Sequence, residues 1–449
     1  MGNGRQLLTE RMRWLTLTTI TIAVFVADAT VVNPGLEESA AYNSDFSQQT
    51  FRKNLEKRVI YEGDQVWRIY KHNDSVTELV QQYDEHGSYS IWSNHPSAVD
   101  IFVRSYMLSN VESILKNCGI KYQVLIDDVQ EAIEDENVPL TVEMAADLEG
   151  RKGHRMEWTS YHRLDDILGY LDYLADTYPD VCSVQTIGQS LEGRPLKVLR
   201  ISNGKPDAPA MWIDGGIHAR EWISPASVTY IIDYLVENSE NLKTDYYILP
   251  VVNPDGYEYT FVSDRLWRKN RRKGFNCAGI DLNRNFGYRW GGKGTSKNMC
   301  HDTYPGNKPF SEPETEAIRN FFEASLANFK AYLSFHSYGQ YILYPWGYDQ
   351  RLPPDYLDLD TAGRQAADAM KRAGGNTEYT VGNSAITLYP AAGGSDDWAK
   401  ALLKIKYAFT IELRDTGRYG FILPARYIVP TAKEALAAIQ VITKVIESS

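Results

Sequence analysis

Two side chains that can bind a metal ion lie three residues apart after an apolar run. His218 and Glu221 stand in the motif GIHAREW, which follows the apolar residues 210–213. A catalytic zinc ion usually takes three protein ligands from His nitrogens and carboxylate oxygens and keeps a further position for water. One tight turn at a strand end can supply two of them. Alone, the pair fits a surface turn equally well, because such motifs often match by chance.

Two further residues complete a possible zinc-hydrolase constellation. His336 follows the apolar residues 333–335 and is the best candidate for a third ligand. Glu412 lies in the apolar run FTIEL, and a buried carboxylate is costly unless it is paired or functional. A Glu beside a metal site can take a proton from water and later give it to a leaving amine. The alternative is a structural ion pair of Glu412 with Arg414 or Arg418.

Other motifs offer groups that bind anions. Asn283 and Arg284 place an amide beside a guanidinium, and Arg binds carboxylates through a two-pronged fork. This pair would suit a free C-terminal carboxylate, although Asn-Arg is also common on surfaces. Arg268 belongs to the basic stretch RKNRRK, which is most often solvated, but one Arg turned inward can stabilise an oxyanion.

The elements around these motifs indicate an α/β fold. From about residue 158 to the C-terminus, helical patterns alternate with apolar strand patterns, which predicts a sheet with helices on both faces. The predicted helices are 162–178, 227–237 and 431–447, and the predicted strands are 197–201, 210–213, 246–252, 331–335 and 407–413. Ligands in such folds bind beyond the carboxyl ends of strands. His218, His336 and Glu412 all lie at or just past predicted strands.

Residues 58–126 predict a separate small module of β-α-β-β-α-β order, typical of a ferredoxin-like fold. The capping patterns Ser75/Glu78 and Ser109/Glu112 mark the expected helix starts. Residues 127–155 form a connector with nine acidic and no basic residues up to position 149. Arg151, Lys152 and Arg155 then follow, in the manner of an exposed trypsin-like cleavage site. A merely solvated linker is the other interpretation.

The N-terminus predicts a secreted protein. Residues 1–29 have a basic start, an uncharged stretch and an Ala-Asp-Ala cleavage site, typical of a signal peptide. That stretch is shorter than the roughly 20 residues that span a bilayer, so we expect no membrane anchor. Residues 30–57 lack periodicity and predict a flexible leader. The net charge of −11 argues against nucleic acid as a partner, and nothing indicates oligomerisation, so we expect a monomer.

Four cysteines allow at most two disulfides. Cys277 and Cys300 flank a Gly-rich loop and form the best candidate pair. Cys118 and Cys182 fall in different predicted domains, so we expect free thiols.

Taken together, these motifs resemble the zinc metallocarboxypeptidases of the pancreatic A/B type, which are secreted as proenzymes. The resemblance runs from about Val59 to the C-terminus and rests on separated blocks in a common order. The blocks are HAREW, NPDG, WRK, NRN, HSY, GGSDDW and ELRDTGRYG. Each block is weak alone, but their joint occurrence is specific. The resemblance implies a mixed, mostly parallel sheet, an inhibitory prodomain at 58–126 and a catalytic domain at 156–449.

The resemblance also implies a role for each site residue. His218, Glu221 and His336 would bind one Zn²⁺, Glu412 would be the general base, and Arg268 would stabilise the oxyanion. The remaining positions would bind substrate or form the family's disulfide. Asn283, Arg284 and Tyr389 would hold the terminal carboxylate, Arg220 and Tyr338 would line neighbouring subsites, and Cys277 would pair with Cys300.

Asp396 decides the expected specificity. In this family an apolar residue at the pocket floor resembles the A type, and Asp resembles the B type, which releases Lys or Arg. A buried carboxylate favours a basic guest and disfavours an apolar one. Ser384 and Ala385 leave room for a long side chain, whereas Gly347 departs from the Ser of many B-type relatives. The alternative is that Asp396 only caps the next helix.

We therefore expect a secreted zinc exopeptidase zymogen that acts on peptide or protein C-termini, releases Lys or Arg, and is activated by a trypsin-like protease. Two alternatives stay open. One is an A-type carboxypeptidase for apolar residues, and the other is a catalytically silent peptide-binding protein with this fold.

Overall fold

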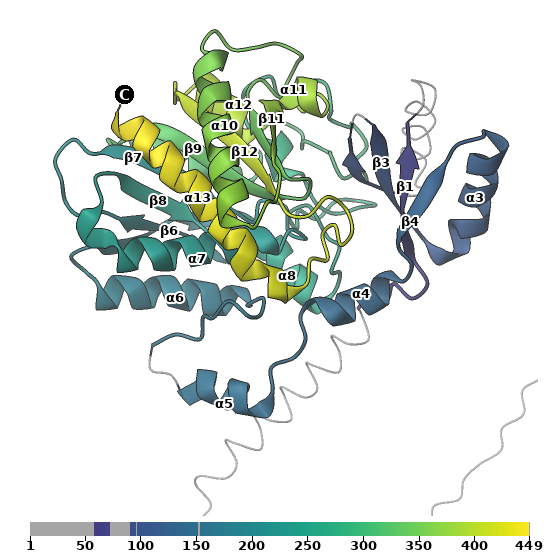
Figure 1. The fold of residues 1–449 in the computed structure, drawn as a ribbon, viewed down its shortest axis with the longest axis horizontal. Coiled ribbons are helices and arrows are strands. Elements are labelled where there is room, and N and C mark those ends of the chain that lie inside the picture. The colour runs from purple at the N-terminus through teal and green to yellow at the C-terminus, as the bar shows by residue number, and fades with distance from the viewer. Residues whose placement is uncertain (1–57, 72–89, 96, 151–152, 449) are drawn as a thin grey trace, which may run out of the picture. The chain divides into compact units, whose positions relative to one another are not determined.

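The computed structural model describes residues 58–71, 90–95, 97–150 and 153–448 (Figure 1). The predicted signal peptide, the leader, the first helix of the small module, Arg151 and Lys152 lie outside these residues. None of the helices in the described part of the chain combines the length and the apolar character needed to cross a bilayer.

The small module contains a four-stranded antiparallel sheet. Its strands are β1 (Gln65–Tyr70), β2 (Ser90–Asn94), β3 (Ala98–Val103) and β4 (Tyr122–Ile126), and their order is β2-β3-β1-β4. Helix α3 (Leu108–Asn117) packs on one face of the sheet, where it contacts Trp67 and Ile69. Val66 and Phe102 point to the other face, because neighbouring residues of a strand alternate in direction. The described elements have the order expected of a ferredoxin-like module.

Helix α3 begins before the predicted cap. Ser109 lies inside the helix, and the N-cap position is Met107, which ends a 3-10 turn at Ser105–Met107. The prediction of a Ser109 cap was therefore wrong. The reason is tertiary, because Asp64 accepts a hydrogen bond from the Ser105 amide at 2.7 Å and anchors the turn from outside the helix.

Two helices follow in the acidic connector, α4 (Val129–Glu136) and α5 (Val142–Gly150). Asp128 caps α4 by accepting hydrogen bonds from the amides of Gln130 and Glu131. Arg155, at the end of the connector, is exposed.

The larger part of the chain is built on an eight-stranded mixed sheet of order β11-β10-β12-β9-β7-β8-β6-β5. Strands β12, β9, β7 and β8 run parallel at its centre, as do β10 and β11, and the other pairings are antiparallel. This confirms the predicted mixed α/β class. The strands are β5 (Cys182–Gln189), β6 (Pro195–Ile201), β7 (Pro209–Asp214), β8 (Asp245–Leu249), β9 (Asn328–Ser337), β10 (Tyr341–Tyr344), β11 (Thr380–Asn383) and β12 (Tyr407–Leu413).

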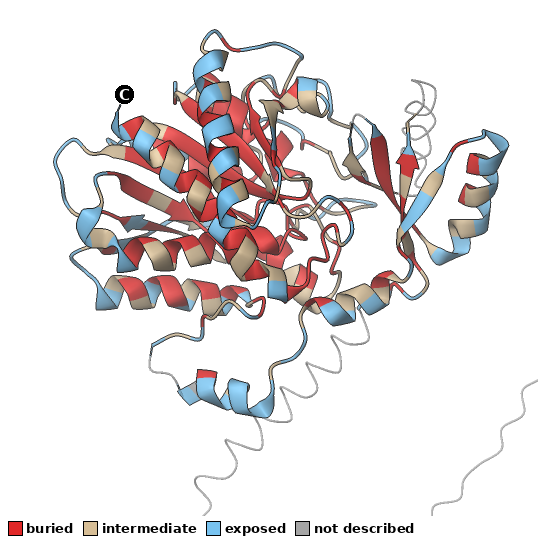
Figure 2. Ribbon diagram, in the orientation of Figure 1, coloured by how far each residue is buried: buried red, intermediate tan, exposed pale blue. Residues whose placement is uncertain are grey.

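Helices cover both faces of this sheet and bury its central strands, which are red in Figure 2, whereas most of the edge strand β5 is not buried. Met211 and Ile213 of β7 join the core on one face, with α6, α7, α10 and α13, and Trp212 joins the core on the other face, with α9 and α12. Strands buried on both faces are apolar throughout. The helices are α6 (Leu164–Thr177), α7 (Ile223–Glu237), α8 (Pro254–Val262), α9 (Pro313–Ala324), α10 (Tyr356–Ala373), α11 (Ser384–Thr387), α12 (Ser395–Ala401) and α13 (Ile428–Glu447).

Helix α7 starts four residues earlier than predicted, at Ile223. Pro225 is compatible with this earlier start, because a proline in the first turn costs no hydrogen bond where the amides have no partner within the helix. The helix therefore begins directly after the GIHAREW motif. This places Glu221 in a short turn between β7 and α7.

Candidate metal centre and active site

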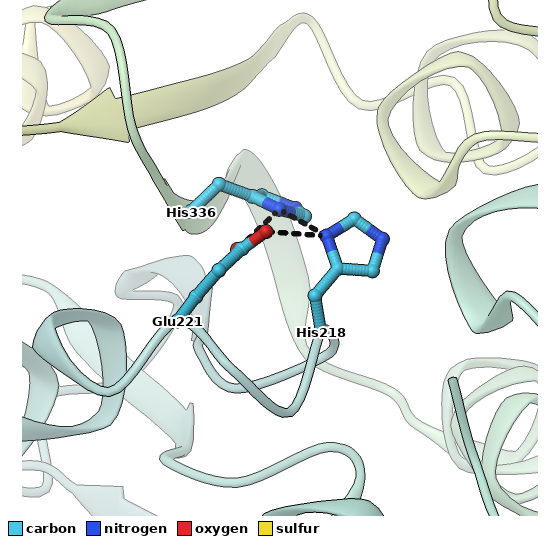
Figure 3. Close-up of side chains that lie close together, drawn as sticks. All are labelled: His218, Glu221 and His336. Carbon is cyan, nitrogen blue, oxygen red and sulfur yellow. Dashed lines mark hydrogen bonds and ion pairs between the residues drawn. The ribbon is translucent and has the colours of Figure 1, made fainter. Parts of the chain in front are cut away.

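The three predicted metal ligands converge at the carboxyl edge of the sheet (Figure 3). His218 and Glu221 come from the turn after β7, and His336 is the penultimate residue of the neighbouring strand β9. His218 Nδ1 lies 2.8 Å from Glu221 Oε1, and His336 Nδ1 lies 3.2 Å from His218 Nδ1 and 3.1 Å from Glu221 Oε2. All three side chains are buried.

This donor set fits zinc. In a tetrahedral site, ligand atoms that lie about 2.0–2.1 Å from the zinc ion lie about 3.3 Å from one another. The donor atoms of His218, Glu221 and His336 have similar separations. Two imidazole nitrogens and one carboxylate also match the ligand chemistry of catalytic zinc sites, which leave one position open. The site therefore has the residues and spacing needed to hold one zinc ion.

Asp281 orients one of the ligands, and the sequence prediction missed it. Its Oδ1 lies 3.1 Å from His218 Nε2, so a proton on Nε2 leaves Nδ1 free to bind metal. Asp281 also accepts hydrogen bonds from Arg268 Nη2 at 2.9 Å and from the Asn283 amide at 2.9 Å. Asp281 is the first residue of the DLNRN motif, and this position was the signal that could have identified it. The sequence analysis considered only Asn283 and Arg284 of the motif.

Glu412 stands beside the metal ligands. It pairs in register with His336 across β12 and β9, and it lines the same cleft as the three ligands. Burial raises the pKa of Glu412 to about 7, which suits a group that takes and returns a proton near neutral pH. Arg414 instead forms an ion pair with Glu434, so the structural pairing with Arg414 does not occur.

Arg268 turns inward from the basic stretch. It lines the cleft and is held by Asp281, while its Nη1 lies 3.9 Å from Glu221 Oε1. A guanidinium fixed beside the ligand set is a suitable partner for negative charge that develops on a carbonyl oxygen.

The predicted carboxylate clamp lies in the same cleft. Arg284 and Asn283 are buried, and Tyr389, which is 38% exposed, lies at the cleft surface. Gly393 packs directly against the clamp. A Cβ atom at this residue would lie 2.3 Å from the Arg284 carbonyl oxygen, and its φ of +80° also favours glycine.

Asp396 lies in the first turn of α12 and lines the cleft together with Gly347, Ser384 and Thr410. It is 6% exposed, and burial raises its pKa. The N-cap position of α12 is occupied by Gly394, which has no side chain to cap the helix, and Asp396 lies inside the helix. The neighbouring Asp397 does not face the cleft but accepts hydrogen bonds from the Gly347 and Tyr348 amides, both at 2.8 Å, and holds the pocket wall.

The two predicted subsite residues contact different groups. Arg220 stacks on Phe421 at 4.2 Å and pairs with Asp302 at 3.2 Å, and its buried Nε has no hydrogen-bond partner within the described residues. Tyr338 donates a hydrogen bond to Asp100 of β3 at 3.0 Å. Residues of β2 (Trp92, Ser93 and Asn94) also line the cleft, so the small module covers the site. The sequence prediction did not name these covering residues.

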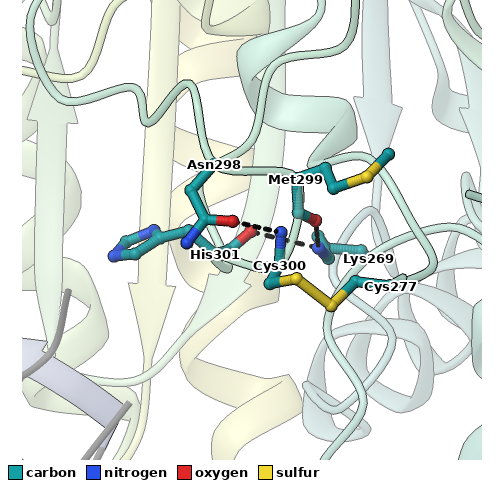
Figure 4. Close-up of a disulfide and its surroundings, with 6 residues drawn as sticks. All are labelled: Lys269, Cys277, Asn298, Met299, Cys300 and His301. Atoms are coloured by element: carbon teal, nitrogen blue, oxygen red, sulfur yellow. Dashed lines mark hydrogen bonds between the residues drawn. A yellow bond between two sulfur atoms is a disulfide. The ribbon is translucent and has the colours of Figure 1, made fainter. Parts of the chain in front are cut away.

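A disulfide joins Cys277 and Cys300 (Figure 4). Lys269 ties the same loop to the core by donating hydrogen bonds to the carbonyl oxygens of Met299 at 2.8 Å and His301 at 3.1 Å. Cys118 and Cys182 are free thiols, the first exposed and the second buried.

Comparison with known proteins identifies the two parts of the chain. Residues 167–438 match the zinc carboxypeptidase family, and residues 67–136 match the carboxypeptidase activation peptide. The chain belongs to the zinc carboxypeptidase family. It is a metallocarboxypeptidase of the pancreatic zymogen type, a hydrolase that acts on peptide C-termini and carries its own activation peptide. The activation-peptide match runs to Glu136, through α4, whereas the predicted domain boundary at 126 stays a prediction.

Named relatives include both specificity types. Carboxypeptidase B of Astacus astacus is 47% identical over 66% of this chain and 99% of the relative, and carboxypeptidase A4 of Mus musculus is 40% identical over 85% and 93%. Among solved structures, thrombin-activatable fibrinolysis inhibitor has a TM-score of 0.76 and 37% identity, covering 86% of this chain and 98% of that one. Carboxypeptidase A of Helicoverpa armigera also has a TM-score of 0.76, at 32% identity over 85% and 97%. These names leave the preferred C-terminal residue open.

Proposed function

We propose that this protein is a secreted, monomeric zymogen which, after cleavage by a trypsin-like protease, uses one zinc ion to release C-terminal Lys or Arg. The observation that carries the proposed specificity is the buried carboxylate of Asp396, which lines the same cleft as the metal ligands, Glu412 and Arg284. A buried carboxylate is stabilised by a cationic guest and is left unpaired beside an apolar one.

The proposed mechanism divides the work among neighbouring side chains. The chemistry that zinc supplies at His218, Glu221 and His336 is Lewis-acid chemistry, which polarises a carbonyl and makes water more acidic. Glu412 takes the proton from the attacking water and transfers it to the amine of the departing residue. Arg268 donates hydrogen bonds to the carbonyl oxygen, which becomes an oxyanion when water attacks the carbonyl carbon.

Substrate binding in this proposal explains why cleavage stops at the last residue. Arg284 and Asn283 bind the terminal carboxylate, with Tyr389 closing from the cleft surface. This contact sets the distance from the chain terminus to Glu412. The terminal side chain then extends toward Asp396, past the small residues Gly347 and Ser384.

The test measures zinc content and compares release of Lys, Arg and Phe from short peptides after trypsin treatment. We expect one zinc per chain, and a kcat/KM for Lys and Arg at least about 100-fold higher than for Phe, because a polar pocket rejects a guest that leaves it unpaired. Preferential release of Phe would establish the A-type alternative. Bound zinc without turnover of any peptide would instead favour a silent binding protein.

A further inference from the structure

A buried hydrogen-bond chain lies behind the metal ligand His336. Tyr332, Ser334 and His336 alternate along β9, so their side chains share one face of the sheet. Strand β7 lies next to β9, and Asp214 pairs with Ser334 in register. The strand pairing therefore places a carboxylate, a hydroxyl and an imidazole in a row.

The distances join these three groups into one chain. Ser334 Oγ donates to Asp214 Oδ1 at 2.6 Å and lies 3.2 Å from His336 Nε2. Asp214 Oδ2 accepts a hydrogen bond from the Trp212 indole at 2.7 Å. Asp214, Ser334 and His336 are each at most 1% exposed.

The number of available protons gives this chain a direction. A hydroxyl has one hydrogen, and Ser334 donates it to the carboxylate, which is an acceptor when ionised. Ser334 therefore offers His336 only lone pairs. The imidazole must then carry its proton on Nε2, which leaves the lone pair of Nδ1 directed at His218 and Glu221.

We propose that Ser334 and Asp214 are positioning residues that hold His336 in the Nε2-protonated form and orient its ring for metal binding. The inference rests on the proposed zinc site. His218 Nε2 contacts the carboxylate of Asp281 directly. His336 Nε2 instead contacts the hydroxyl of Ser334, which in turn donates a hydrogen bond to the carboxylate of Asp214. Loss of such outer partners commonly lowers metal affinity by about 10–100-fold.

The test uses the full chain with the variants Ser334→Ala and Asp214→Asn. Ser227→Ala is the matched control, because it removes a buried hydroxyl that has no hydrogen-bond partner among the described residues. Zinc dissociation constants are measured by competition with a chelator. We expect the Kd to rise about 10–100-fold in Ser334→Ala and in Asp214→Asn and to stay unchanged in Ser227→Ala.

A second measurement separates this role from general destabilisation. In metal-free protein labelled with ¹⁵N-histidine, measured well above the His336 pKa of about 9 so that the ring is neutral, the parent should show the His336 proton on Nε2. Ser334→Ala should show a mixture of the two neutral ring forms under the same conditions. A parent protonated on Nδ1, or a Ser334→Ala variant with unchanged ring form and zinc affinity, overturns the inference. Failure of the parent to bind zinc would instead refute the proposed metal centre, so the two failures are distinguishable.

Discussion

At the scale of single residues, the cleft contains two glutamates, Glu412 and Glu221, whose surroundings differ. Glu412 and Glu221 lie in the same cleft, yet only Glu221 contacts both histidines. Glu412 forms no ion pair within the described residues, and burial raises its pKa to about 7. These different environments support the proposed roles of Glu221 as a metal ligand and Glu412 as the group that carries the proton.

This difference makes Glu412→Gln informative. The amide keeps the shape of the side chain but cannot accept a proton, so we expect zinc content to be retained and kcat to fall by about 10²–10⁴-fold. Metal analysis and peptide turnover check both parts. Glu221→Gln is the contrasting variant, in which zinc binding itself should weaken. An active Glu412→Gln protein would refute the assignment of the base.

Asp396 carries the prediction about specificity. We expect Asp396→Ile to lower the kcat/KM for C-terminal Lys and Arg by at least about 100-fold and to raise it for apolar residues, because the pocket loses its buried charge. Asp396→Asn serves as the matched variant, since it removes the charge and keeps the shape. It should lose Lys and Arg release without gaining apolar substrates. Unchanged preference in both would show that Asp396 does not contact the terminal side chain.

At the scale of elements, adjacent parallel strands gather the site. Strands β12, β9 and β7 end at one edge of the sheet, so the residues at their ends meet although up to about 200 positions separate them in the chain. The loop before α12 must then approach the clamp closely. Gly393 makes that approach possible, because its backbone lies against the Arg284 carbonyl.

We therefore expect Gly393→Ala to damage substrate binding. The added Cβ would lie 2.3 Å from the Arg284 oxygen, so the loop or the clamp must move, and the kcat/KM should fall about 10-fold or more. Gly375→Ala is the control, since Gly375 has a similar φ of +71° and no atom within 4 Å of the added Cβ. It carries the backbone strain without the clash. Equal kinetics in the two variants would contradict this account.

At the scale of the whole molecule, a buried ion pair attaches the activation peptide (residues 67–136) to the catalytic part of the chain. Glu136 of α4 forms a salt bridge with Arg265, and both side chains are 1% exposed. Arg265 also stacks on Trp222 at 3.8 Å and donates a hydrogen bond to the Phe421 carbonyl at 2.8 Å. A second contact joins Arg68 of β1 to the Thr416 carbonyl at 2.7 Å.

Removal of the Glu136 carboxylate should therefore lower the stability of the zymogen but not that of the activated enzyme. Glu136→Ala leaves the Arg265 charge buried and unpaired, and we expect a loss of about 3–5 kcal/mol in the unfolding free energy of the zymogen. Urea unfolding measures this loss. Asp135→Ala, an exposed change in the same helix, is the control. After activation and removal of the activation peptide, all three proteins should unfold alike, and a persistent difference would contradict the role.

The sequence alone predicted the chemical types of His218, His336 and Glu412 and their places at strand ends, because each lies in or just after an apolar run. It also indicated the two-part organisation, since periodicity and charge change abruptly along the chain. It missed Asp281, misplaced the starts of α3 and α7, and did not suggest Ser334 or Asp214. The start of α3 and the roles inferred for Asp281, Ser334 and Asp214 depend on contacts with distant residues, which local patterns do not contain.

The tertiary structure decided which donors face one another. GIHAREW began as a motif that also fitted a surface turn, and its ligands converge with His336 because β7 and β9 are parallel neighbours. Strand register then set Glu412 beside His336, and Ser334 beside Asp214. Strand register depends on which strands pair, so the local sequence does not contain it, and only the tertiary structure decides how the site residues are arranged. The sequence by itself determined which chemical groups the site contains.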